Sequence, residues 1–446
     1  MLRHLIQSAI SPALAFYLAL CGFVGGALLW ARPVIAQQVD PGLRQEFLSD
    51  PLKDRTPDPL LPMLTVKRDL SPLELSALAI DLGLLDQNAQ QLLAAGEPDQ
   101  AFELWRRSLR LRRLLGPFEE FAAIQKIAEV AWQQQRSEDV QLLTLRTRQI
   151  WQTIQAALGL PIEPKFGALP IDESAPASLL VSGNTASNLE VLTALAQTFT
   201  TLRDIDSAVE VYQQLIALTA AQTPAPSNQI TAQKVSLAKL HLEWFQFAEA
   251  ADVYLELLKS ARNTGDVVSE TAYLEQLVYS YQQADSLTNA VRAQTDLIGL
   301  YQSQGEVEKL PQLLVAIAQN YRALNLPKPA IEYYRSAYSA AQSLQQFSFS
   351  AQVLKDLGEL YRSLALTDEA IGAYSLLIPV ERQAYNSYGI MNAYDNIGQL
   401  QRRQGNLQAA FQAFEQALVI ARDLNLREDY FIEQIGSVAP PPSLIP

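Results

Sequence analysis

The chain has few of the residues on which most enzymes and metal sites depend. Its 446 residues include one cysteine and two histidines, and both Cys21 and His4 lie near the N-terminus. Only His241 remains in the rest of the chain. Zinc sites made of Cys and His, and nucleophilic triads with a His base, are therefore not supported. Paired carboxylates such as Glu119 and Glu120 have no evident cleft that would shift a pKa. We expect no catalytic site, no cofactor and no metal.

Positive charge and glycine are also scarce. Acidic residues outnumber basic ones by 47 to 34, which gives a formal net charge of −13. Nucleic acid phosphates need clustered Lys and Arg, so nucleic acid is not an expected partner. The chain has only 19 glycines and long segments rich in Ala, Leu, Gln and Glu, which favour helix. The composition therefore predicts an all-α protein.

What the chain does contain is a repeat of about 40 residues. In each unit a small residue opens the second of two predicted helices, and the last five steps between these residues are 42, 40, 40, 40 and 40. A unit of this size cannot bury its own apolar face, so neighbouring units must stack. The pattern predicts a solenoid of about eight helical hairpins. The eight marker residues are Ala101, Val140, Ala208, Ala250, Ala290, Ala330, Ala370 and Ala410.

One unit resembles a known repeat family. The motif L-x2-L-G-x2-Y runs from Leu354 to Tyr361, and A-x3-Y runs from Ala370 to Tyr374. Both are similar to the tetratricopeptide (TPR) repeat pattern, whose period is about 34 residues. The resemblance implies a right-handed, all-α TPR-like solenoid of a longer-helix variant. It also implies a concave groove that binds protein partners.

The N-terminus predicts export. Residues 1–36 read as a signal peptide, with Arg3 before an apolar run at residues 13–30 and with Val34 and Ala36 at the positions that precede a cleavage site. An uncleaved anchor is the alternative, because the run approaches the length of about 20 residues that spans a bilayer. A third and less favoured interpretation is a lipoprotein site at Cys21. We expect the protein in the periplasm or an equivalent lumen.

The remaining chain divides by composition. Five prolines predict an extended lead-in at residues 37–70. N-terminal TPR-like repeats at 71–157 and C-terminal ones at 188–430 flank a long loop at 158–187, and the chain closes with a Pro-rich tail at 431–446. The long loop is interpreted either as a partner contact or as a connector. His241 falls at a core position of the repeat and is interpreted as a packed ring.

A ladder of arginines is the main candidate for a binding site. Arg322, Arg362 and Arg402 each follow the same core position in successive repeats, and the family resemblance places this flank in the inner groove. Lys355, Asn392 and Asn396 fall near positions that the family uses to hold carboxylates, but the family's full set is not reproduced, so its specificity is not carried over. These residues predict a groove for an acidic or extended segment of a protein partner. The alternative is local pairing on the surface, such as Arg362 with Glu359.

A second basic patch lies in WRRSLRLRR, which contains Arg106, Arg107, Arg110 and Arg113. The i, i+4, i+7 spacing puts three of these arginines on one helical face. This face is interpreted either as a solvated outer surface or as a docking patch for an acidic partner or anionic lipid.

These features together predict an exported, non-enzymatic protein-binding scaffold that uses the concave groove. A narrower version is an assembly factor for envelope or photosynthetic membrane complexes. The alternative is a membrane-tethered envelope protein, anchored by residues 13–30, that binds lipid or cell-wall polymer.

Overall fold

The structure, a computed structural model, describes residues 39–53, 57–62, 68, 70–160, 169 and 185–438, with side chains from 188 onward in the last range. The predicted signal peptide with its cleavage site, the apolar run at 13–30 and Cys21 all lie outside these residues. So do most of the predicted loop at 158–187 and the end of the tail after residue 438. No helix in the described ranges is both long and apolar enough to cross a bilayer.

Regular structure in the described residues consists of 18 α-helices and short 3-10 turns, without strands. The chain divides into unit 1, up to Gln233, and unit 2, from Lys234. Unit 1 holds α2 (Pro41–Leu48), α3 (Pro72–Ala94), α4 (Pro98–Arg112), α5 (Pro117–Gln133), α6 (Ser137–Leu158), α7 (Thr185–Leu202) and α8 (Ile205–Ala220), and α9 (Ser227–Glu243) contains the boundary. Unit 2 continues with α10 (Phe247–Thr264), α11 (Val267–Gln283), α12 (Leu287–Gln304), α13 (Leu310–Ala323), α14 (Pro327–Ser343), α15 (Phe347–Ser363), α16 (Thr367–Gln383), α17 (Ser387–Arg403), α18 (Leu407–Leu424) and α19 (Glu428–Val438).

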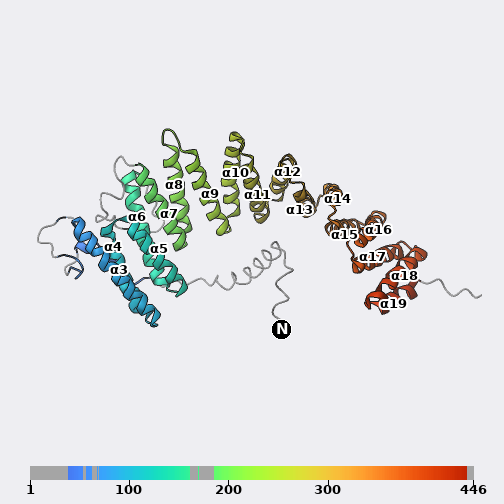
Figure 1. The fold of residues 1–446 in the computed structure, drawn as a ribbon, viewed down its shortest axis with the longest axis horizontal. Helices are drawn as coiled ribbons and strands as arrows, with labels where there is room; N and C mark the ends of the chain where they lie inside the picture. The colour runs from blue at the N-terminus through green and yellow to red at the C-terminus, as the bar shows by residue number, and fades with distance from the viewer. Residues whose placement is uncertain are drawn as a thin grey trace, which may run out of the picture. The chain divides into compact units, whose positions relative to one another are not determined.

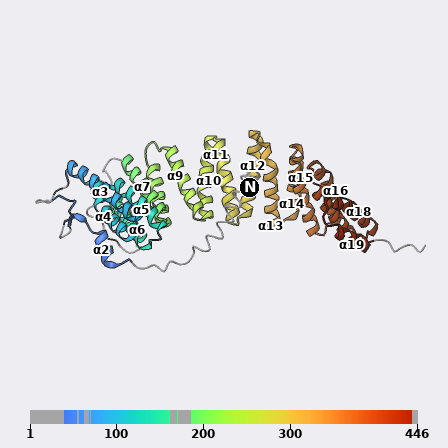
Figure 2. The same cartoon turned by 60° about the horizontal axis from the view of Figure 1, so that its bottom comes forward.

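Successive helices lie side by side within each unit (Figure 1; Figure 2). The predicted all-α, TPR-like solenoid is therefore confirmed. The eight marker residues of the repeat are all buried, as expected for residues at helix crossings.

The turns of unit 2 repeat as regularly as its helices. A residue with a left-handed backbone ends a helix every 20 positions, from Phe245 and Gly265 through to Gly405 and Asn425. At Ala365 the N–H groups of Ala365 and Leu366 donate to the carbonyls of Arg362 and Tyr361, at 3.2 and 3.0 Å. This is the Schellman arrangement, which satisfies the last carbonyls of a helix.

Close helix crossings in unit 2 pair a glycine with an aromatic ring. A Cβ atom added to Gly398 would lie 2.6 Å from the ring of Phe414, and one added to Gly358 would lie 2.9 Å from the ring of Tyr374. Both rings are almost completely buried. The small residue is thus required wherever the ring of the second helix reaches the backbone of the first.

The predicted extended lead-in at 37–70 is wrong for part of its length. Pro41–Leu48 forms α2, in which Pro41 occupies the first turn and the Asp40 carboxylate accepts the N–H of Leu43 at 2.9 Å. Proline is tolerated in the first turn because the N–H that it lacks has no helical partner there. Phe47 and Leu48 are buried in the core of unit 1.

The boundary of the predicted tail is also wrong. Helix α19 continues past residue 431 to Val438, and Phe431 is fully buried. Within the predicted loop, α6 ends at Leu158 and α7 begins at Thr185. Leu169 between them is buried, and its N–H donates to Gln152 Oε1 at 3.1 Å.

Candidate functional site

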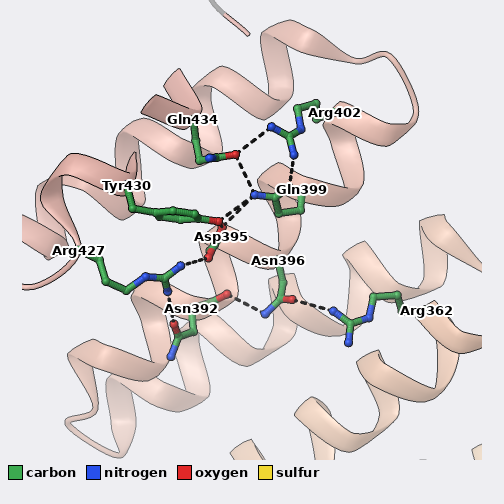
Figure 3. A network of polar contacts seen from close by, with 9 residues as sticks. All are labelled: Arg362, Asn392, Asp395, Asn396, Gln399, Arg402, Arg427, Tyr430 and Gln434. Atoms are coloured by element: carbon green, nitrogen blue, oxygen red, sulfur yellow. Dashed lines mark hydrogen bonds and ion pairs between the residues drawn. The ribbon is translucent and has the colours of Figure 1, made fainter. Parts of the chain in front are cut away.

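The candidate site is the surface formed by α13, α15, α17 and α19, which we call the first-helix surface. Each is the first helix of a hairpin, except that α19 takes this place after the last hairpin. Side chains connect neighbouring members of the set, from Arg362 on α15 to Asn396 on α17 and from Arg402 on α17 to Gln434 on α19 (Figure 3). Arg362 and Arg402 of the predicted ladder therefore each reach the next first helix of this set.

Two of its arginines are exposed. Arg322 lies near Tyr334: burial raises the pKa of the Tyr334 hydroxyl, and the positive charge of Arg322 opposes that shift. Arg362 donates from Nη1 to Asn396 Oδ1 at 3.4 Å, a long hydrogen bond. Its hydrogen bond thus goes to the next first helix and not to Glu359, so the alternative of local pairing with Glu359 is not what the structure shows.

The third arginine is held by α19. Arg402 donates to Gln434 Oε1 at 2.8 Å and to Gln399 Oε1 at 2.6 Å (Figure 3). Asn392 accepts a hydrogen bond from Arg427 at 3.1 Å. The donors and acceptors of this end of the ladder are therefore satisfied within the chain.

The contact between α17 and the start of α19 also contains a partly buried ion pair. Asp395 accepts from Arg427 at 2.8 Å and from the hydroxyl of Tyr430 at 3.0 Å, and Arg427 lies 4.3 Å from the centre of the Tyr430 ring. The sequence reasoning missed this network because it assigned residues 431–446 to a tail. The amphipathic stretch from Tyr430 to Ile435 is the signal that could have revealed α19.

Lys355 is exposed on α15 and lies among carboxylates. Burial raises the pKa of Asp356, and the positive charges of Lys355 and Arg322 oppose that shift. Burial likewise raises the pKa of Glu381, against a hydrogen bond from Asn386. Lys355 thus lies near the partly buried acids Asp356 of α15 and Glu381 of α16. The exposed basic residues of α13 and α15 are Arg322, Lys355 and Arg362.

The arginines of the second basic patch do not form the exposed face that the sequence predicted. Arg107 makes two hydrogen bonds of 2.7 Å to the Asp58 carboxylate, and Arg110 donates to Ser49 Oγ at 2.9 Å. Arg113 is 2% exposed and donates to the backbone carbonyls of Ser49 and Phe47. These arginines therefore anchor the lead-in segment to α4.

The remaining arginine of the patch is also paired. Arg106 donates to Asp139 Oδ1 at 2.6 Å, and that carboxylate is buried. A deeper pair joins Arg146 to Glu120 at 2.6 and 3.0 Å, with both side chains buried. Neither the solvated face nor the docking patch is what the structure shows. Helical spacing placed the arginines on one face but gave no information on which segment covers it.

His241 is 6% exposed, and its Nδ1 lies 2.7 Å from Gln246 Oε1. The interpretation of a packed ring is confirmed. In the part of the chain that the structure describes, no group of three or more His, Cys, Asp or Glu residues could hold a metal ion.

Unit 1 contains a hollow of about 700 Å³ between α7 and α9. Thr193 and Gln197 line it and take the repeat positions that Lys355 and Glu359 take in α15. Gln233 also lines it, donating to Thr219 at 2.9 Å while its buried Oε1 has no partner among the described residues. The corresponding surface of unit 1 is therefore lined by amides and not by cations.

Comparison with known proteins finds similarity in segments of the same repeats. Two family models, each described as tetratricopeptide repeat, match residues 349–423 and 191–225. These two segments of the chain are thus similar to tetratricopeptide repeats. The first matched segment contains Lys355, Arg362, Asn392 and Arg402. The matched segments thus include most of the predicted ladder.

Solved structures with low sequence identity are also similar. BtubC from P. vanneervenii is 20% identical, with 50% of this chain and 90% of that chain covered and a TM-score of 0.32. MamA is 18% identical, with coverage of 42% and 96% and a TM-score of 0.30. The TPR2AB domain of yeast Sti1, in a complex with pHSP90, is 13% identical, with coverage of 57% and 100% and a TM-score of 0.24. No curated protein sequence matches the chain.

Proposed function

We propose that the chain is an exported, non-enzymatic protein-binding scaffold that holds an acidic, extended segment of a partner on the first-helix surface of unit 2. One observation carries the proposal. Arg362 is exposed there with a single hydrogen bond of 3.4 Å, beside exposed Arg322 and Lys355. Stacked helical repeats commonly bind partners along such extended surfaces.

The binding region is shorter than the full ladder. Arg402 and Asn392 already have partners on or next to α19, so a partner would have to displace those contacts. At Arg362 a partner would displace a hydrogen bond of 3.4 Å to Asn396, which is longer than the contacts of Arg402. Guanidinium groups bind carboxylates through paired hydrogen bonds, and such contacts weaken with salt when they are exposed to solvent.

The test uses a fluorescent peptide of alternating Glu and Gly as the probe and measures its anisotropy with the full chain. Replacing Arg322 and Arg362 together with Gln should weaken binding about tenfold or more, since a hydrogen bond to a charged group contributes about 1.5–3 kcal/mol. The matched control replaces Arg292 and Arg382, exposed arginines on the second helices α12 and α16, with Gln. Equal losses in both double variants would show only a general charge effect and would overturn the assignment of this surface.

Export is part of the proposal and rests on residues 1–36. Cleavage after Ala36 would leave Gln37 as the mature N-terminus, in the periplasm or an equivalent lumen. In that compartment the scaffold would serve as an assembly factor for membrane complexes. Intact-mass measurement of the protein from cell fractions tests this step. An uncut chain in the membrane fraction would instead favour the tethered protein that binds lipid or cell-wall polymer.

A further inference from the structure

Helix α3 of unit 1 is apolar on two separate faces. Leu78, Leu82, Leu85 and Ala89 form the buried face, which packs into the core of unit 1. A second stripe of apolar residues lies roughly 140° away around the helix axis, at about 100° per residue. In this stripe Leu73 is 84% exposed, Ile80 68% and Leu84 54%, and Ala77 between them is also exposed.

The stripe has the spacing of a helix–helix seam. Leu73, Ala77, Ile80 and Leu84 follow one another at steps of four, three and four residues, which keeps one face of a helix against a partner helix. Leu73 is held rigidly, because a capping box between Ser71 and Glu74 fixes the first turn of α3. Single exposed apolar residues are ordinary, but a contiguous stripe marks an interaction surface.

Gly83 is a second, independent observation. It lies inside the 23-residue helix, although glycine is the poorest helix former after proline. A Cβ atom at this position would have no atom within 4 Å, so no contact within the chain requires glycine there. A glycine at the edge of an apolar stripe permits the close approach of another helix.

The two ends of the described solenoid differ in this respect. Helix α19 exposes one large aliphatic side chain, Ile432 at 47%, among the exposed acidic residues Glu428, Asp429 and Glu433. Terminal elements of repeat proteins need such polar outer faces to remain soluble. Helix α3, the first helix of the repeats, instead exposes Leu73, Ile80 and Leu84.

We propose that the α3 stripe binds the same stripe of a second copy of this chain, with the two helices antiparallel. An antiparallel pair that is symmetric about the midpoint between Ala77 and Ile80 places Leu73 opposite Leu84 of the second copy. It also places Ala77 opposite Ile80 of the second copy, so a small residue meets a large one in both central layers. A parallel pair would put Ala77 against Ala77 and leave that layer underfilled.

The flanks of the stripe fit the same arrangement. On one flank Ser76 approaches Gly83 of the second copy, and both are small. On the other flank Asp81 approaches Glu74 of the second copy. Arg68 makes two hydrogen bonds to Glu74, at 2.7 and 2.8 Å, and so offsets the negative charge of Glu74 on this flank. The pairing is therefore self-complementary in size, as a two-fold interface must be.

Sedimentation of the full chain over a micromolar concentration series tests the proposal. A monomer–dimer equilibrium is expected, and Ile80→Asp should weaken it by about tenfold or more. The matched control is Val268→Asp, which changes an aliphatic side chain that is 80% exposed on α11 of unit 2. Because both side chains face solvent, circular dichroism should show the same helicity in both variants.

Disulfide cross-linking tests the orientation in a Cys21→Ser background, which has no other cysteine. Leu73→Cys combined with Leu84→Cys should give a covalent dimer, and each single variant should not. Cross-linking of the single variants as readily as the double variant would indicate a parallel pair and overturn the proposed arrangement. A chain that stays monomeric throughout the series, or a dimer that Ile80→Asp leaves intact, would overturn the proposal altogether.

Discussion

Replacing Gly398 with alanine should destabilise the protein, although the same change at Gly372 should stabilise it. Both glycines lie inside helices of unit 2, Gly398 in α17 and Gly372 in α16. The intrinsic preference for helix favours alanine by about 1 kcal/mol at either position. The sign of the outcome is therefore set by the space around the new methyl group.

That space differs sharply between the two sites. At Gly398 the methyl carbon would lie 2.6, 2.8 and 2.9 Å from three ring atoms of Phe414, whose side chain is fully buried and cannot swing outward. Overpacking of this kind costs about 1–3 kcal/mol, which exceeds the gain in helix preference. At Gly372 no atom lies within 4 Å, so the gain is unopposed. We expect a loss of about 1–2 kcal/mol for Gly398→Ala and a gain of about 0.5–1 kcal/mol for Gly372→Ala.

Urea unfolding followed by far-ultraviolet circular dichroism measures both changes. Because repeat arrays can unfold in parts, the midpoint of the phase that reports on unit 2 is the quantity to compare. Gly358→Ala should resemble Gly398→Ala in direction, since its methyl group would lie 2.9 Å from the Tyr374 ring. A midpoint for Gly398→Ala at or above that of the unchanged chain would refute the packing argument, whatever the result at Gly372.

Three further outcomes follow from other parts of the structure. Replacing Arg146 with Met should cost about 1.5–3 kcal/mol in the free energy of unfolding, because the buried Glu120 carboxylate loses its hydrogen bonds from Arg146 and keeps the longer ion pair with Arg113, at 3.6 Å; thermal unfolding checks it. Tyr385→Gly should stabilise the chain by about 0.5–1 kcal/mol, measured in urea, because Tyr385 has a φ of 55° and is 96% exposed. The hydrogen bond from Arg68 lowers the pKa of Glu74 from 4.5 to about 2. Since the folded value lies below the unfolded one, this stabilisation is present above pH 4.5 and is lost as the pH falls through about 2. Hydrogen exchange at the start of α3 should report that loss, and unchanged protection across this range would contradict it.

The sequence predicted the helix crossings well because they depend on neighbouring residues. Ala370 and Tyr374 lie four residues apart and define one face of a helix, and the complementary small residue recurs one period earlier and later. His241 occupies the first-helix core position that Tyr361 takes in its own repeat, and it is packed as expected. Local periodicity determines which residues are buried when each unit contacts only its neighbours.

The fate of the arginines could not be predicted in the same way. Arg113 and Arg107 bind a segment about 50 to 65 positions earlier in the chain, which the prolines made look extended. Arg402 binds α19, whose residues were assigned to the tail. Helical spacing indicates which arginines share a face, but the tertiary structure determines which segment covers that face. The part of the candidate site that remained exposed, around Arg362, is the part with no such distant partner of opposite charge.

The left-handed turn that recurs every 20 residues in unit 2 has a consequence for how such a chain can lengthen. Each helix from α10 to α18 ends in the same turn geometry, whether the turn closes a hairpin or joins two hairpins. A duplicated stretch of 40 residues would therefore meet its neighbours through a junction that already exists, wherever along the period the duplication began. Recombination between misaligned copies need not respect hairpin boundaries to give a foldable product. Helix α19 is a fixed endpoint of the described part of this unit, because its contacts with Asp395 and Arg402 require those particular side chains on α17.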